Sequence, residues 1–265
     1  MPALRHFSGA NIMPDQCLQN GALTSGYLGF SGNAPSISSW TDIFQAIHCL
    51  RNVETLIISS HNSGSMTRPS TNDLVPARFN HLKTLIVHNS GRQDSTNPIF
   101  ESIFSMFRAP NLIKLTVEMK AYISVFNPSI EAIFDGDDPY PSLLELNVKC
   151  HVSHAFGDIF PKVLARLPNL QTLSIQGVYS TCRVDVGPLF ARGHSFPPLR
   201  KLRLHYCADV SDSAIREMLA ELRRGPRWPD FQVLELIGCS RMSLRYLGRL
   251  KETLGDKMNS SAVLS

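Results

Sequence analysis

Apolar residues recur along the chain in a short pattern, Leu-x-x-Leu-x-apolar, in which the x positions are mostly polar. The stretch "LRKLRL" is a clear copy, because Leu199, Leu202 and Leu204 stand three and two positions apart. Two apolar residues separated by one polar residue suit a short β-strand with one buried face, and the longer first spacing suits a bend before it. A lone strand would leave its backbone without partners, so the pattern predicts more strands elsewhere.

The same pattern occurs seven times at nearly constant spacing. Its copies start at Val53, Leu82, Leu112, Leu143, Leu170, Leu199 and Phe231. Successive starts are 27 to 32 residues apart, and weaker copies lie upstream at residues 4–7 and 23–28. A fixed period of this length is typical of stacked repeats, in which each strand pairs in parallel with the equivalent strand of the next repeat.

The segments between the strands predict helices and loops that return the chain. Apolar residues stand at helical spacing in "SWTDIFQAIHCL", "NPIFESIFSMF", "NPSIEAIF", "DSAIREML" and "SLRYLGRLKETL". Ser or an Asn-Pro pair precedes these segments, as expected at helix N-termini. We therefore expect a helix over residues 97–107 that includes Phe107, whereas the polar residues 61–78 predict a looser loop.

Three stretches link this repeat to a known family. They are "LRKLRLHYCADVSDSAIREML", "FQVLELIGCSRMSLRYL" and "LRNVETLIIS". They resemble leucine-rich repeats of the longer, ribonuclease-inhibitor-like kind, and among these the cysteine-containing repeats of fungal F-box proteins. The resemblance implies an α/β fold, a leucine-rich-repeat solenoid or horseshoe with a parallel sheet on the concave face and helices or loops on the convex face.

The resemblance also sets the expected domain organisation. Residues 1–255 are expected to form a single solenoid of about eight to nine repeats, and residues 256–265 a frayed tail. An F-box is a helical segment ahead of the repeats, and the chain is expected to begin inside a repeat, at Leu4, without one. A Skp-type adaptor and a cullin are therefore expected as partners only if an F-box lies upstream.

Charge is distributed unevenly between the two ends of the chain. Residues 1–150 carry 10 Lys and Arg against 12 Asp and Glu, whereas residues 151–265 carry 16 against 10. Most of this excess is arginine, so an acidic polymer such as RNA is an alternative partner. Aromatic residues do not alternate with the arginines as a base-stacking surface requires, which makes nucleic acid the less favoured partner.

The cysteines and the apolar runs bear on the compartment. Six cysteines are spread through the chain without a Cys-x-x-Cys pair, and neither a signal peptide nor a membrane-spanning run is visible. We therefore expect reduced thiols in the cytoplasm or nucleus. Cys207 and Cys239 each lie three residues after the last strand leucine, where we expect core residues rather than nucleophiles.

The residue patterns of known reactive sites are incomplete in this sequence. Cys150, His151 and His154 lack a fourth nearby metal ligand, and the acidic residues 135–138 lack the alternating ligands of a calcium loop. "GFSGN" is one residue too short for a nucleophile elbow, and no phosphate-binding loop is present. We therefore expect no catalytic residue, no metal and no cofactor.

The positions between the strand leucines are the candidate binding residues, because in this architecture they face the concave surface. We expect a protein ligand to contact a set of such residues, namely Tyr27, Ile57, Ile86, His88, Lys114, Glu118, Glu145, Lys149, Gln176, Lys201, Arg203, His205 and Glu235. Lys201, Arg203 and His205 form a basic rung within this set. The expected function is non-catalytic protein–protein recognition, as in the substrate-recognition part of an SCF-type ubiquitin ligase receptor.

Overall fold

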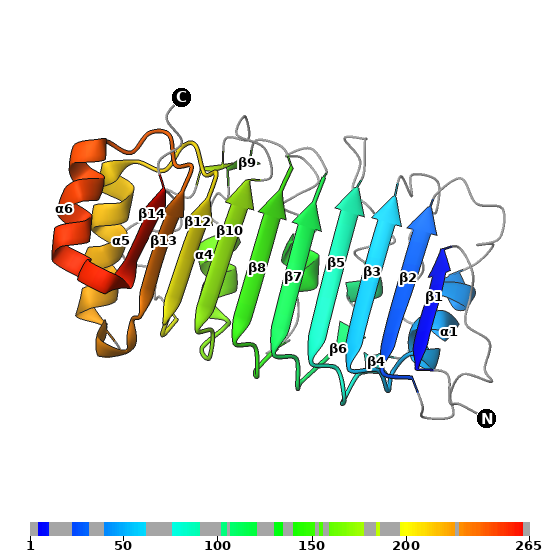
Figure 1. Ribbon diagram of the computed structural model, residues 1–265. Helices are drawn as coiled ribbons and strands as arrows, with labels where there is room; N and C mark the ends of the chain where they lie inside the picture. Colours follow the sequence, from blue (N-terminus) through cyan, green and yellow to red (C-terminus); the bar gives the residue numbers. More distant parts are fainter. Residues whose placement is uncertain are drawn as a thin grey trace. The chain divides into compact units, whose positions relative to one another are not determined.

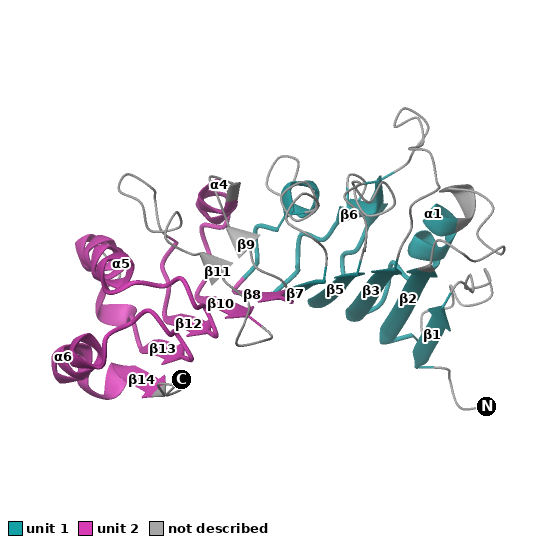
Figure 2. Cartoon of the chain, turned by 90° about the horizontal axis from the view of Figure 1, so that it is seen from above, with its two compact units in different colours: residues 1–143 teal, residues 144–265 magenta. Residues whose placement is uncertain are grey.

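The computed structural model describes residues 5–10, 23–31, 40–61, 76–90, 102–104, 107–120, 130–134, 140–151, 154–155, 159–177, 184–185, 197–225 and 228–261. The chain divides into two compact units, Met1–Leu143 and Leu144–Ser265, which Figure 2 colours separately. The fold is mixed α/β. Ten of the described strands belong to long parallel ladders, five in each unit.

Unit 1 contains a parallel ladder in the order β1-β2-β3-β5-β7 (Figure 1). Its elements are β1 (His6–Ala10), β2 (Ser25–Ser31), α1 (Trp40–Cys49), β3 (Thr55–His61), β4 (Ala77–Arg78), β5 (Thr84–Ser90), β6 (Phe107–Arg108) and β7 (Lys114–Met119). The short strands β4 and β6 pair with each other. Figure 2 shows α1 and β6 on the same side of the ladder.

Unit 2 contains a parallel ladder in the order β8-β10-β12-β13-β14. Its elements are β8 (Glu145–Cys150), β9 (His154–Ala155), α4 (Ile159–Ala165), β10 (Thr172–Gly177), β11 (Val184–Asp185), β12 (Lys201–His205), α5 (Asp212–Arg224), η4 (Trp228–Asp230), β13 (Val233–Ile237), α6 (Leu244–Leu254), η5 (Gly255–Lys257) and β14 (Met258–Ser261). The short strands β9 and β11 pair with each other. Figure 2 shows α4 and α5 on one side of the ladder.

The repeat pattern is the pattern of the core. The second residue of the motif lies in register from strand to strand, as in Leu173, Leu202 and Leu234 of unit 2, and all three side chains are fully buried. The first apolar residue of each copy precedes its strand and is buried as well. Successive strand side chains point to opposite faces, so the residues between the leucines face away from this core.

A shared backbone carbonyl links each repeat to the next at the bend before the strand. The carbonyl of Glu54 accepts hydrogen bonds from the backbone N–H groups of Lys83 and Thr84, at 2.8 and 3.0 Å. The same arrangement occurs at the carbonyls of Arg5, Thr24, Lys83, Leu144, Gln171 and Arg200, with N···O distances of 2.7 to 3.2 Å. Each acceptor immediately precedes a strand, so these bonds fix where successive strands begin.

The two C-terminal helices begin where the sequence predicts. Ser211 caps α5 by accepting from the N–H of Ala214, and Ser243 caps α6 by accepting from the N–H of Tyr246. Asp212 then accepts hydrogen bonds from the N–H and hydroxyl of Ser243, which ties the two helix starts together. The prediction of α1 is also confirmed, although its expected capping residue Ser39 lies outside the described residues.

The predicted helix over residues 97–107 is wrong at its end. Phe107 lies in β6 and not in a helix, and helical geometry is described only at residues 102–104. The Phe107 ring stacks on Phe79 at 4.3 Å between centroids, and both rings are buried. Phe107 is therefore buried, as its apolar character suggests, but it reaches the core from a strand and not from a helix. In "NPSIEAIF" residues 130–133 are helical, and the Asn-Pro start lies outside the described residues.

Part of the expected frayed tail is ordered. Residues 258–261 form β14, which pairs in parallel with β13, so the prediction is wrong for these residues. Met258 lies in register with Leu234 and is 7% exposed, which means that it extends the buried row. One apolar residue in "KMNSS" is too weak a pattern to predict a strand. Within the part of the chain that the structure describes, no helix has the length and apolar character needed to cross a membrane.

The buried row predicts a large difference between neighbouring positions of one strand. Leu202→Ala leaves a cavity in the core and is expected to lower the free energy of unfolding by about 2 to 5 kcal/mol. Lys201→Ala, one residue earlier and half-exposed, is expected to change it by less than about 0.5 kcal/mol. Urea unfolding followed by circular dichroism measures both. Equal losses would contradict the assignment of the two faces.

Candidate functional site

The predicted binding residues all lie on the strand positions that face away from the buried leucines. Each of them is partly exposed. We call them the unit 1 strand face (Tyr27, Ile57, Ile86, His88, Lys114 and Glu118) and the unit 2 strand face (Glu145, Lys149, Gln176, Lys201, Arg203, His205 and Glu235). The predicted alternation of these residues with buried ones is observed. Their role in binding stays a prediction.

An apolar row crosses the unit 1 strand face. Tyr27, Ile57 and Ile86 lie in register on β2, β3 and β5. The Tyr27 ring extends along its own strand over Gly29, because a Cβ atom at Gly29 would lie 3.2 Å from both the Tyr27 Cε1 atom and its hydroxyl. Glycine at position 29 thus leaves room for the ring. The row is a half-exposed apolar stripe with one aromatic residue at its end.

Charged residues lie next to this row at the carboxyl ends of the strands. Glu118 Oε1 is 3.4 Å from Lys120 Nζ, and Glu118 Oε2 is 3.7 Å from His88 Nε2. His88 and Glu118 are register neighbours on β5 and β7, which explains their contact. The apolar row of unit 1 is therefore bordered by an ionic group that carries both signs of charge, through Glu118 and Lys120.

A serine–histidine contact at the same strand ends was missed by sequence reasoning. The hydroxyl of Ser59 lies 3.1 Å from His61 Nε2, and the other ring nitrogen of His61 contacts the hydroxyl of Ser90. A hydrolytic triad would place a carboxylate at that second nitrogen. Here a serine occupies it, and Ser59 is only 2% exposed. The arrangement is therefore a polar network and not a nucleophile with its base.

The basic rung of unit 2 is partly neutralised by a residue of the next strand. Arg203 Nε lies 2.9 Å from Glu235 Oε2, and His205 Nε2 lies 3.4 Å from Glu235 Oε1. Arg203 and Glu235 are register neighbours on β12 and β13. The sequence places the three basic residues correctly on one strand, but the charge of the unit 2 strand face is mixed. Among the described residues, no carboxylate forms an ion pair with Lys201 or Lys149.

Cys207 and Cys239 donate to the backbone of the preceding repeat. The Cys207 thiol lies 3.6 Å from the Ile175 carbonyl, and the Cys239 thiol lies 3.4 Å from the Leu204 carbonyl. Cys207 is fully buried, as predicted, whereas Cys239 is only partly buried. Burial raises the pKa of Cys207 well above its usual value and that of Cys239 to about 11. Both thiols are therefore protonated at neutral pH, which argues against a nucleophilic role.

The residue before each of these cysteines has an unusual backbone conformation. Tyr206 has φ of 54° and Gly238 has φ of 66°, both in the left-handed region. The Tyr206 ring covers Gly238 so closely that a Cβ atom there would lie 2.6 Å from Tyr206 Cδ1. Two successive repeats therefore make the same turn after their strands, and the second turn can do so only with glycine.

Of the candidate metal ligands from the sequence, the side chain of His154 lies outside the described part of the chain. No group of three or more His, Cys, Asp or Glu side chains within the described ranges is placed to hold a metal ion. Cys150 is buried at the end of β8, while the acidic residues 135–138 lie outside the described residues.

Comparison of the sequence with models of known protein families finds no matching family, and comparison with curated proteins finds no matching relative.

The thiol environments predict slow alkylation of the folded chain. At pH 8 we expect iodoacetamide to modify Cys207 and Cys239 much more slowly in the native protein than in guanidinium chloride, because burial keeps both thiols protonated. Peptide mass mapping follows each site separately. Equally rapid modification of native and unfolded protein would contradict the buried, donating geometry.

The same shifts predict a loss of stability at alkaline pH. Unfolding lowers the raised pKa values of these thiols toward the ordinary thiol value of 9.0, so above about that pH the unfolded state releases protons that the native state retains. The contribution of these thiols to the free energy of unfolding is therefore expected to be constant below this pH and to fall above it. Replacing Cys239 by Ser should reduce the fall, as measured by urea unfolding across the pH range.

Proposed function

We propose that this chain is a leucine-rich-repeat solenoid whose strand faces recognise a protein partner without catalysis. The observation that carries the proposal is the regular exposure of varied side chains between the buried leucines. Such rows form broad surfaces and not a deep apolar pocket, and broad surfaces of mixed polarity suit protein ligands better than small molecules. The repeat spacing and the parallel ladders support the solenoid.

The apolar row of unit 1 is suited to anchor a partner. Aromatic and aliphatic side chains that become fully desolvated supply most of the binding energy in protein interfaces. Tyr27 contributes such a ring, and Ile57 and Ile86 extend the apolar area beside it. The neighbouring His88 and Glu118 would then lie at the polar rim, where charges favour one orientation of the partner.

The unit 2 strand face is suited to select a partner by charge. Arg203 and His205 share Glu235, so their charges are partly satisfied before any partner binds. Lys201 and Lys149 project from the same face, and they would attract carboxylates of the partner. This division suggests that apolar burial supplies affinity in unit 1 and that charge supplies specificity in unit 2.

The F-box-like cysteine repeats lead to a more specific form of the proposal. The chain would be the substrate-recognition part of an SCF-type ubiquitin ligase receptor in the cytoplasm or nucleus. The fungal F-box resemblance of "LRKLRLHYC" and "FQVLELIGC" supports this form. The adaptor and the cullin would join only through an F-box ahead of the repeats.

Affinity capture with matched variants tests the proposal. The tagged chain is expected to retain a partner from a fungal lysate, identified by mass spectrometry. Ile86→Ser and Lys201→Glu should each weaken capture of that partner at least about tenfold, which corresponds to about 1.4 kcal/mol. Thermal unfolding of each variant checks that it remains folded.

Lys162→Glu is the control for the charge change. Lys162 is exposed on α4, on the side of unit 2 that carries the helices, so this variant changes the net charge equally without altering the strand face. We expect it to capture the partner as well as the original chain does. Equal capture by all four proteins would refute recognition by the strand faces.

A further inference from the structure

A basic groove lies between α5 and α6 of unit 2, away from the strand face. The two helices lie side by side in Figures 1 and 2. The groove has a volume of about 420 Å³ and is lined by Arg216, Leu219, Ala220, Arg223, Tyr246, Arg249, Leu250 and Thr253. Three of these residues are arginines and none is acidic. Leu219 and Leu250 are buried and form an apolar floor.

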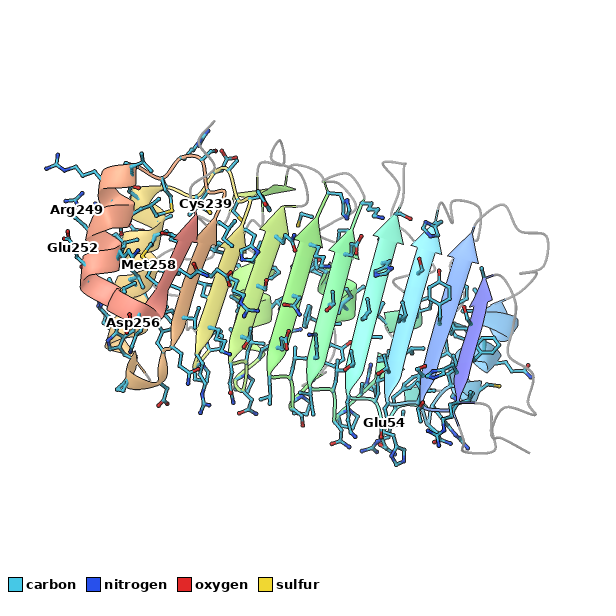
Figure 3. The ribbon with its side chains drawn as sticks, in the orientation of Figure 1. Glu54, Cys239, Arg249, Glu252, Asp256 and Met258 are labelled. Carbon is cyan, nitrogen blue, oxygen red and sulfur yellow. The ribbon has the colours of Figure 1, made fainter. Side chains whose placement is uncertain are left out.

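The arginines are held in place by aromatic rings and not by carboxylates. Arg216 and Arg249 both lie over the Tyr246 ring, at 5.7 and 5.9 Å from its centroid, and Arg223 lies 5.2 Å from that of Trp228. No carboxylate in the described residues pairs with any of the three. Figure 3 shows Arg249 on the side of α6 away from the strands.

Two acidic residues of these helices have partners outside the groove, and the other two, Glu217 and Glu252, do not line it. Glu221 pairs with Arg224 on α5, and Asp212 accepts hydrogen bonds from Ser243 at the start of α6. The three guanidinium groups of the groove thus have unused donors that are suited to carboxylates. Because the rings already restrict the arginine side chains, less conformational entropy is lost when an anion binds.

We infer that this groove binds an acidic segment of another protein, in which one aliphatic side chain enters between flanking carboxylates. The aliphatic side chain would cover Leu219 and Leu250, while the carboxylates would bind Arg216, Arg223 and Arg249. The Tyr246 hydroxyl is hydrogen-bonded to Arg216, and burial raises the pKa of Tyr246 above its ordinary value of 10.0. This site lies beyond the proposed strand-face function and does not depend on it.

The geometry favours an acidic peptide over a nucleic acid. Single-stranded nucleic acids bind by stacking their bases on exposed aromatic rings. Here the rings of Tyr246 and Trp228 already contact cations, and Trp228 also stacks on Phe231 at 5.3 Å with an angle of 12° between the rings. Phosphates would find the arginines, but the bases would find few free ring faces.

A defined peptide probe tests this inference. A fluorescein-labelled peptide of glutamates with one central leucine is titrated with the full chain at low ionic strength, and fluorescence anisotropy gives the Kd. We expect saturable binding that weakens at least about tenfold in the double variant Arg216→Glu/Arg249→Glu. The neutral variant Arg216→Gln/Arg249→Gln should fall between the two and guards against misfolding by charge reversal.

Matched controls separate the groove from general electrostatic attraction. The control variant Arg245→Glu/Lys251→Glu changes the net charge of the chain by the same amount as Arg216→Glu/Arg249→Glu. Both of its substitutions lie on α6 outside the groove lining, so we expect the Kd to be nearly unchanged. Peptides with Gln for Glu or Ser for Leu should bind more weakly than the probe. The inference would be overturned if the probe did not bind, if both charge-reversed variants weakened binding equally, or if replacing Leu in the peptide had no effect. Preferential binding of oligouridylate at these arginines would overturn it as well.

Discussion

The repeated structure depends on one backbone carbonyl per repeat that accepts two successive N–H groups. This carbonyl belongs to the residue just before a strand, and its donors are the equivalent residue of the next repeat and the residue after it. Because both donors are at the bend, the next strand starts at a fixed height and its leucines fall in register with those before it. Side chains at these bend positions are as different as Glu54, at the lower strand ends in Figure 3, and Leu144. The interaction therefore places little demand on sequence beyond the buried leucines.

The strands were predictable from sequence because each leucine pattern marks a strand and its inward face. The return segments were less predictable, since their apolar residues only need to cover the core. Phe107 satisfies that need from β6 by stacking on Phe79, where helical spacing had suggested a helix. Met258 extends the buried row from β14 with a single apolar residue, too little for a sequence pattern. The need to bury apolar side chains determines which residues of the return segments face the core. It does not determine whether those residues lie in a helix or in a strand.

The strand face was predictable as a set of positions but not as a distribution of charge. Alternation along β12 assigns Arg203 and His205 to one face, yet the neutralising contact comes from Glu235, which is adjacent only through the register of β12 and β13. The groove between α5 and α6 was even harder to predict from the sequence. Its arginines are scattered through the sequence among other basic residues, and only the packing of the two helices brings Arg216 and Arg249 to the same tyrosine ring.

The contact between Tyr206 and Gly238 couples two sites that are one repeat apart. The ring occupies the space that any side chain at position 238 would need, and the positive φ at that position disfavours other residues independently. Tyr206 adopts a similar backbone conformation itself, so the turn tolerates a side chain where no ring from the preceding repeat covers it. Exchange of one whole repeat at this point would therefore have to preserve both the aromatic residue and the glycine, although the two residues belong to different repeats. The boundary between these repeats is thus constrained by a pair of residues and not by either repeat alone.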